Sequence, residues 1–200
     1  MMLKICGITN SEDGRAAVDA GAGAIGFNFY PRSPRYIAPE RARAIALPAH
    51  ILRVGVFVNE PRGYVETVAH AAALDIVQLH GDEARGDYPQ GFAIWKAARV
   101  SAGFDFAPYE NSPAEAILLD GPAAELYGGA GRTFDWNVAA RLRKRVVIAG
   151  GLDASNVAAA VRIARPWGVD ACSKIESSPG KKDHRKMREF LQAAREALES

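Results

Sequence analysis

Six polar side chains lie at or near the ends of short apolar runs, where a buried strand would give way to a loop. A thiol, two carboxyl groups and an imidazole are among them, and proteins use such groups to move protons. A cysteine acts as a base only as its thiolate, which requires a pKa below its ordinary value of about 8.5. Packing alone does not explain apolar runs that end repeatedly in polar groups. The six residues are Cys6, Asn28, Gln78, His80, Asp120 and Asp170.

Each of these residues also has a structural interpretation when it is taken singly. A free cysteine such as Cys6 belongs to one of the most commonly buried residue types and is then inert. Asp120 precedes a Gly-Pro pair, and His80 precedes a Gly-Asp pair; both pairs are typical of turns. The choice between these interpretations depends on whether the six residues converge in space.

Two glycine-containing segments are candidates for ligand binding. Gly150-Gly151 fits either a tight turn or a phosphate site, because barrels of alternating strands and helices bind phosphate after their seventh and eighth strands. Segment 127–133 contains Gly131 but lacks the Gly-Lys-Ser/Thr end of a Walker loop. Its composition is typical of a loop that closes over a ligand, or of a plain connector.

Metal ligands and cofactor motifs have little support in this sequence. The four histidines lie far apart along the chain, and the two cysteines do not form a CxxC pair. We therefore expect neither a metal ion nor an organic cofactor.

Eight short runs rich in valine and isoleucine alternate with helix-like stretches. Their continuous apolar character is typical of strands that are buried on both faces of a parallel sheet. The pattern predicts a (β/α)8 TIM barrel formed by residues 1–200 as one domain, with its chemistry at the ends of the strands. The expected strands are Leu3–Ile8, Ala24–Asn28, Leu52–Val58, Asp75–His80, Ala93–Ala97, Ala116–Asp120, Val146–Gly150 and Val169–Cys172.

The helices between these strands differ in the strength of their signals. Asp153 is expected to cap a helix that carries Val157, and Asp183 is expected to cap the last helix. The second to fourth helices are also predicted. Glycine and proline interrupt residues 98–114, so we expect a short or irregular fifth connection.

Charge and composition exclude several classes of protein. Lysine and arginine number 25 against 23 acidic residues, and this balance does not predict a nucleic-acid partner. The most apolar stretches, such as Val146–Leu152, are far shorter than the roughly 20 residues of a membrane helix. The chain also starts without the apolar core of a signal peptide, and its two cysteines form no disulfide framework. We expect a cytoplasmic protein without a membrane partner.

Eight motifs lie along the chain: KICGIT at 4–9, GFNF at 26–29, SPRY at 33–36, VGVFV at 54–58, QLHG at 78–81, LLD at 118–120, FDW at 134–136 and AGGL at 149–152. Taken together, these motifs resemble the family of phosphoribosylanthranilate isomerase, which catalyses the third dedicated step of tryptophan biosynthesis. The resemblance runs through nearly the whole chain. Related barrels of the histidine pathway carry an aspartate where this chain has Cys6.

The resemblance implies an Amadori rearrangement of N-(5-phospho-β-D-ribosyl)anthranilate to 1-(2-carboxyphenylamino)-1-deoxy-D-ribulose 5-phosphate. Asp120 would be the general acid that opens the furanose to a Schiff base, and Cys6 the general base that removes the C2 proton. Arg35 would bind the anthranilate carboxylate through two parallel hydrogen bonds, with Arg32 as the local competitor. The predicted substrate-binding residues are Arg35, His80, Gln78, Asn28, Asp170, Gly131, Gly150, Gly151 and Ser173.

The chain departs from the family pattern near the eighth expected strand. Lys174 stands where the family commonly has a glycine, so it would either block a close approach of phosphate or add a cationic contact. Barrel closure would also make the first strand a neighbour of the eighth and bring Cys6 near Cys172. Two interpretations of Cys172 are open: a disulfide partner of Cys6, or a simple replacement for a small family serine.

Two other functions are compatible with a barrel of this kind, because a fold alone does not decide function. One is a non-catalytic barrel that binds a phosphorylated metabolite, which would need neither Cys6 nor Asp120. The other is a carbon–carbon lyase or metal-dependent aldolase, for which Lys96 is the only evident Schiff-base candidate. For the isomerase, the expected partner is a small phosphorylated aminoribose bearing anthranilate, and the expected state is a monomer or weak homodimer.

Overall fold

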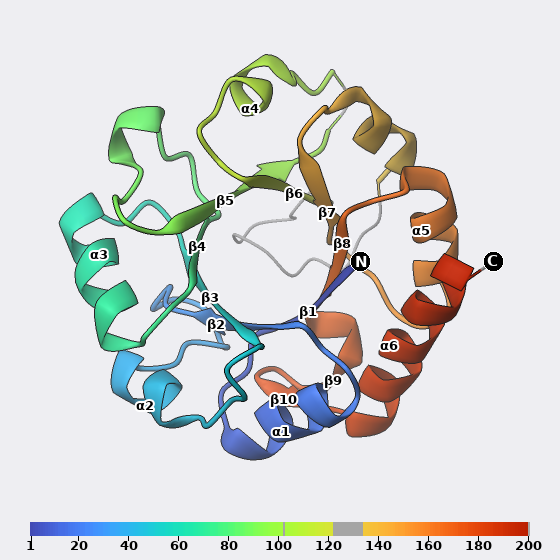
Figure 1. Cartoon of the computed structure of the whole chain (residues 1–200), viewed down its shortest axis with the longest axis horizontal. Coiled ribbons are helices and arrows are strands. Elements are labelled where there is room, and N and C mark those ends of the chain that lie inside the picture. Colours follow the sequence, from blue (N-terminus) through green and yellow to red (C-terminus); the bar gives the residue numbers. More distant parts are fainter. Residues whose placement is uncertain (102, 122–133, 200) are drawn as a thin grey trace.

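Eight parallel strands close into a barrel in the computed structural model of the chain (Figure 1). The structure describes all residues except 102, 122–133 and 200. Pairing of the first strand with the eighth closes the barrel, which confirms the predicted fold class. The strands are β1 (Met2–Cys6), β2 (Ala24–Asn28), β3 (Leu52–Phe57), β4 (Ile76–Leu79), β5 (Ala93–Arg99), β6 (Ala116–Asp120), β7 (Arg145–Ile148) and β8 (Gly168–Ala171).

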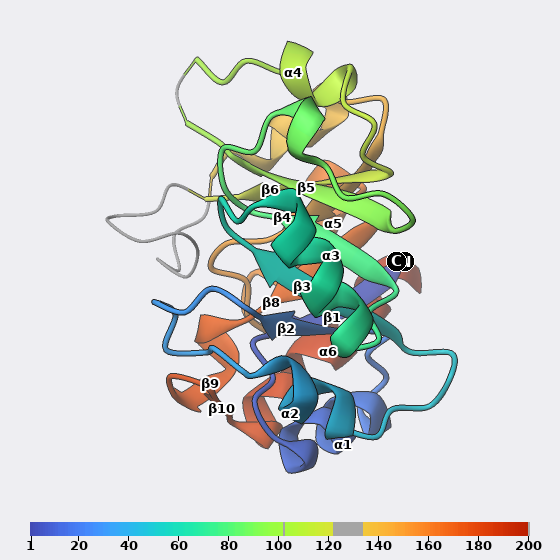
Figure 2. The ribbon, with the colours of Figure 1, turned by 90° about the vertical axis from the view of Figure 1, so that its left-hand side faces the viewer.

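Helical segments surround the barrel and connect its strands (Figures 1 and 2). Within the described residues, no helix has the length and apolar character needed to cross a membrane. The α-helices are α1 (Ser11–Asp19), α2 (Pro39–Ala44), α3 (Arg62–Ala71), α4 (Ala107–Glu110), α5 (Val157–Ala164) and α6 (His184–Glu199). The described residues also form short 3₁₀ helices, namely η1 (Arg85–Asp87), η2 (Trp136–Arg141) and η3 (Ser173–Ile175).

Side chains along each strand alternate between the barrel interior and the layer under the helices. On β6, Ile117 and Leu119 belong to the apolar cluster that also contains the helix residues, whereas Leu118 belongs to a separate cluster with Trp95. Asp120 follows Leu118 by two positions and therefore faces the interior at the end of its strand. The same alternation directs the other predicted polar residues toward one end of the barrel.

Two connections differ from the predicted helices. The predicted fourth helix is wrong: the chain after β4 forms only η1, because Gly81, Gly86 and Pro89 interrupt any longer helix. Asp153 also does not cap α5, which begins at Val157. Its carboxylate instead accepts hydrogen bonds from the backbone and hydroxyl of Ser155 and fixes the turn before the helix.

The other helix predictions agree with the structure. The fifth connection is irregular, as expected, since its helix α4 has only four residues. Asp183 caps α6, because its carboxylate accepts hydrogen bonds from the backbone N–H groups of Arg185 and Lys186. These contacts satisfy N–H groups that the first turn of a helix leaves without partners.

A small antiparallel hairpin between β8 and α6 was not predicted from the sequence. Its strands are β9 (Glu176–Ser178) and β10 (Lys181–Lys182), and Figure 1 shows it beside α1. The hydroxyl of Thr9 donates to the carbonyl of Gly180 over 2.6 Å, and the carboxylate of Asp13 accepts from the backbone of Lys182 over 2.9 Å. The hairpin is thereby fixed to the beginning of the chain.

Candidate active site

A cavity opens at the carboxyl ends of the barrel strands, with a volume of about 710 Å³ that includes its open mouth. The structure brings nearly all of the predicted site residues to its wall. These are Cys6, Asn28, Arg35, Gln78, His80, Asp120, Gly150, Gly151, Asp170 and Ser173. Gly131 lies outside the described residues. Arg32, the alternative to Arg35, is exposed and is not among the described residues that line the cavity.

Asp120 lies opposite a histidine and a glutamine in this cavity. The Nε2 atom of His80 is 3.3 Å from Oδ2 of Asp120, and its Nδ1 atom is 3.2 Å from the amide nitrogen of Gln78. The amide donates in this contact, so Nδ1 is the acceptor and the proton of a neutral imidazole is on Nε2. The imidazole can therefore direct an N–H group toward Asp120 or toward a ligand.

Several buried polar atoms of the wall have no hydrogen-bond partner within the described part of the chain. They are Oε1 of Gln78, Nε2 of His80 and Oδ1 of Asp170. Unpartnered buried polar atoms are uncommon in native proteins, because each one costs the free energy of its lost hydration. A polar ligand with several hydroxyl groups would satisfy them.

Cys6 lies next to a buried ion pair between Lys4 of β1 and Asp170 of β8. Lys4 is fully buried, and its ammonium group donates to Asp170 over 2.8 Å. Burial alone would lower the pKa of Lys4, but the neighbouring Asp170 and Cys6 raise it above the ordinary value. Burial raises the pKa of Asp170 to about 7, although Lys4 opposes this shift.

Gly26 makes room for this arrangement. It pairs with Cys6 across β1 and β2, and a Cβ atom at this position would lie 2.8 Å from Sγ of Cys6 and 3.1 Å from Cε of Lys4. A Cβ atom here would force the sulfur, and to a smaller extent the lysine stem, to shift, so the glycine leaves room for both side chains.

The ionisation of Cys6 differs from what the sequence suggested. A base was expected to have a lowered pKa, but a hydrogen bond to Cys172 and burial raise the pKa of Cys6 well above its ordinary value. Lys4 acts in the opposite direction and does not overcome these two effects. Both cysteines are free thiols in the structure.

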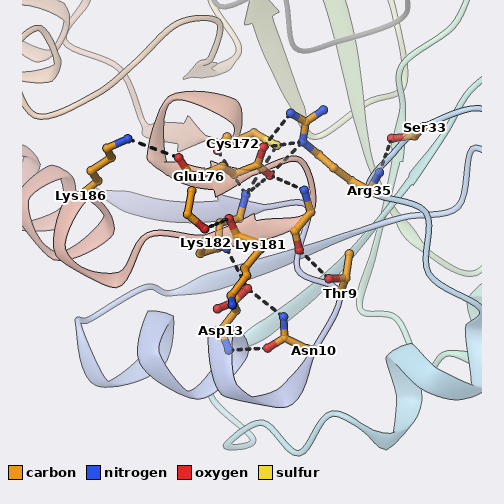
Figure 3. Close-up of polar contacts among 12 residues, drawn as sticks. Thr9, Asn10, Asp13, Ser33, Arg35, Cys172, Glu176, Lys181, Lys182 and Lys186 are labelled. Atoms are coloured by element: carbon orange, nitrogen blue, oxygen red, sulfur yellow. Dashed lines mark hydrogen bonds and ion pairs between the residues drawn. The ribbon is translucent and has the colours of Figure 1, made fainter.

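Arg35 is held in place by Glu176, a residue that sequence reasoning missed. The Nε and Nη2 atoms of Arg35 donate to the two oxygens of Glu176 over 2.9 and 2.8 Å, and Lys182 donates to the same carboxylate over 2.8 Å (Figure 3). Burial would raise the pKa of Glu176, but these two cations hold it below the ordinary value. Within the described part of the chain, Nη1 of Arg35 takes no part in this pairing, and Nη2 has a second N–H group besides the one directed at Glu176.

The predicted phosphate end of the cavity contains two adjacent glycines with positive φ. Gly150 has φ 78° and Gly151 has φ 65°, a conformation that L side chains rarely adopt. Ser173 and Lys174 line the same cavity from the segment after β8. Lys174 is exposed, so its ammonium group is free to rotate toward an anion.

Lys96 does not occupy a position suited to a Schiff base. Its ammonium group donates to the carbonyl of Gly81 over 2.6 Å and to Glu83 over 2.8 Å, and it is not among the described residues that line the cavity. Lys96 therefore fixes the loop after His80. Within the described part of the chain, no three histidine, cysteine or acidic side chains are grouped to hold a metal ion.

A closed barrel with proton-transfer groups and cations around one end cavity defines a class of protein, the (β/α)8-barrel enzymes that act on small anionic substrates. Comparison with known proteins specifies the family. The family model for N-(5'-phosphoribosyl)anthranilate isomerase matches residues 3–193. The chain therefore belongs to the N-(5'-phosphoribosyl)anthranilate isomerase family.

Individual relatives cover nearly the full chain. The N-(5'-phosphoribosyl)anthranilate isomerase of Solibacter usitatus is 64% identical over 99% of both chains. A phosphoribosylanthranilate isomerase solved with reduced 1-(o-carboxyphenylamino)-1-deoxyribulose 5-phosphate has a TM-score of 0.84 at 38% identity, over 98% of this chain and 99% of that one. The structure of monomers made from the dimeric enzyme of Thermotoga maritima has a TM-score of 0.83 at 39% identity, over 98% of this chain and 99% of that one.

Proposed function

We propose that the chain isomerises N-(5'-phosphoribosyl)anthranilate to the corresponding 1-deoxyribulose 5-phosphate, with Cys6 as general base and Asp120 as general acid. The observation that carries this proposal is that the thiol of Cys6 and the carboxyl of Asp120 line one cavity from different strands of the barrel. Acid and base must reach different atoms of one small sugar, and a shared cavity between β1 and β6 meets this requirement.

Asp120 acts first in the proposed reaction. Its protonated carboxyl group gives a proton to the ring oxygen of the furanose, and the ring opens to a Schiff base between C1 and the anthranilate nitrogen. The Nε2 atom of His80 lies 3.3 Å from Oδ2 of Asp120 and stabilises the carboxylate that remains.

Cys6 acts second. Its thiolate takes the proton from C2, the electron pair moves toward C1, and the product is an enolamine that rearranges to the ketone. The cationic nitrogen of the Schiff base makes the C2 proton more acidic and attracts the thiolate. Hydrogen is lost at C2 and gained at C1 of the same molecule, so the reaction needs no external oxidant or reductant.

The substrate spans the cavity between two positively charged ends. The Nη1/Nη2 edge of Arg35 binds the anthranilate carboxylate, while Glu176 holds the other edge of the guanidinium group. Gly150, Gly151 and Ser173 bind the phosphate through backbone and hydroxyl donors, and Lys174 adds a cation. The sugar hydroxyls bind to the polar side chains between these ends, which are Asn28, Gln78, His80 and Asp170.

The test is direct turnover by the purified protein. Substrate is incubated with the enzyme in the presence of a chelator, and the loss of anthranilate fluorescence is followed over time. Turnover at a rate that depends on enzyme concentration is expected. A protein that binds the substrate without converting it would overturn the proposal in favour of a metabolite-binding barrel.

We also propose that residues 1–200 work as one unit in the cytoplasm, as a monomer or weak homodimer. Pairing of β1 with β8 supports the single unit, because the barrel needs strands from both ends of the chain. Light scattering across a range of protein concentrations measures the oligomeric state, and a mass that stays at that of a dimer after strong dilution would contradict it.

A further inference from the structure

The two cysteines of the chain meet at the wall of the cavity. Cys6 ends β1 and Cys172 follows β8, and the pairing of Ile5 with Ala171 places the next residues side by side. Their side chains interact and influence each other's pKa, and both line the cavity. A Cβ atom at Gly7 would lie 3.0 Å from Sγ of Cys172, so the glycine keeps space for this sulfur.

The two sulfur atoms have different electrostatic surroundings. Cys172 faces two cations from other elements: Lys182 of β10, whose ammonium group is 3.8 Å from Sγ, and Arg35 of the loop after β2 (Figure 3). Glu176 of β9 is the acidic group on this side and is paired with both cations.

Cys6 faces Lys4 at close range, and Arg35 of the loop after β2 also interacts with its charge. Lys4 approaches it from β1, and that ammonium group is already paired with Asp170 of β8. Asp170 in turn interacts with the charge of Asp120 from β6. The side of the cavity that holds Cys6 therefore stabilises a negative charge less well than the side that holds Cys172.

These surroundings determine which of the two cysteines keeps its proton when only one of them is ionised. The hydrogen bond from Cys6 lowers the pKa of Cys172 to about 7, with help from Lys182 and Arg35 and against the effect of burial. The same hydrogen bond and burial raise the pKa of Cys6. When only one of the two thiols is ionised, these shifts place the negative charge on Cys172 and leave the proton on Cys6.

We propose that Cys172 is the proton acceptor that converts Cys6 into the reactive thiolate when substrate binds. This inference rests on the function proposed above and makes Cys172 a positioning residue that acts through Cys6. The S–H bond of Cys6 breaks and an S–H bond forms on Cys172, with no change of oxidation state. Cys6 then takes the C2 proton, which exchanges with water, and gives a proton to C1, while the C2 hydroxyl returns a proton to Asp120.

Substrate binding supplies the driving force for the transfer. The anthranilate carboxylate adds a negative charge beside Arg35, and this weakens the stabilisation of a Cys172 thiolate. The cationic Schiff base forms beside Cys6 and attracts a negative charge there. Both changes favour moving the negative charge from Cys172 to Cys6, because opposite charges at short range stabilise each other.

The experiment compares Cys172→Ser and Cys172→Ala with the wild type, by thiolate absorbance of the substrate-free protein and by the pH dependence of kcat/KM. The wild type is expected to form one thiolate at a pH of about 7. Both variants should lose this step, since neither serine nor alanine ionises there. If Cys6 then titrates near the ordinary value of about 8.5, activity at neutral pH falls roughly 10-fold and returns at high pH.

The serine variant separates this role from a structural one. Serine keeps the size and hydrogen bond of the side chain, so a structural role predicts recovery in Cys172→Ser and loss in Cys172→Ala. The proposal is overturned if kcat/KM of Cys172→Ser decreases toward acidic pH over the same range as that of the wild type. It is also overturned if both variants lose the same fraction of activity at every pH. If the wild type shows the thiolate step but no turnover, the proposed function fails instead.

Discussion

Glu176 holds Arg35 and Lys182 at the cavity, so Glu176→Gln should reduce both stability and substrate affinity. The glutamine keeps the shape of the side chain but replaces one acceptor oxygen with an NH₂ donor that faces a cation. Removing one partner of a buried ion pair typically costs about 3 to 5 kcal/mol. The Arg35 side chain is 13% exposed and can regain some water, whereas Lys182 is 0% exposed and cannot. We therefore expect the free energy of unfolding to decrease by about 3 kcal/mol, near the lower limit of this range.

The same substitution releases the guanidinium group of Arg35 from its fixed orientation. A charged hydrogen bond contributes about 1.5 to 3 kcal/mol, so loss of half of this contribution to the substrate carboxylate would raise KM roughly 4- to 13-fold. Urea unfolding followed by fluorescence measures the first effect, and steady-state kinetics measures the second.

Asp13→Asn is the matched control. Asp13 accepts from the backbone of Lys182 and contacts His184, so it anchors the same hairpin without touching Arg35. The control should lose stability and keep the wild-type KM. An unchanged KM in Glu176→Gln, or an equal rise of KM in both variants, would show that Glu176 does not position Arg35.

Three further predictions concern the ends of the cavity and its thiol pair. Arg35→Lys keeps the charge but loses the planar fork, so preference for a substrate with the ortho-carboxylate should fall; an unchanged kcat/KM in Arg35→Ala would mean that the carboxylate binds elsewhere. Lys174→Gly should raise KM a few-fold in low salt and less in high salt, because screening weakens a cation–phosphate contact; a lower KM would show that Lys174 obstructs the site. Mild oxidant should inactivate the enzyme reversibly through a disulfide between Cys6 and Cys172, and reversible inactivation that persists in Cys172→Ser would contradict this.

The barrel could be predicted from the sequence because its strands are buried on both faces. Such strands are continuous apolar runs, and a polar residue at the end of one of them is conspicuous. Asp120 after Ala116–Leu119 illustrates this, since period-two alternation also gives the direction of its side chain. The convergence of these residues in one cavity followed from the fold class.

The supporting residues could not be predicted in the same way. Glu176 and Lys182 lie on a hairpin too short to produce a periodic pattern, and their pairing with Arg35 spans distant parts of the chain. Lys4 did give a signal, since a lysine within an apolar strand needs a buried partner, but Asp170 is 166 positions away. The raised pKa of Cys6 depends on the position of Cys172 relative to Lys182, which only the three-dimensional structure specifies.

Transfer of the C2 proton to Cys6 is tested most directly with substrate that carries deuterium at C2. Release of this deuterium into water is followed by nuclear magnetic resonance for the wild type, Cys6→Ala and Asp120→Asn, each first shown to be folded by circular dichroism. The wild type should release the label during turnover, and removal of the base or the acid should slow conversion about 10²- to 10⁴-fold. Release of the label by Cys6→Ala at close to the wild-type rate would contradict the role of Cys6 as the base.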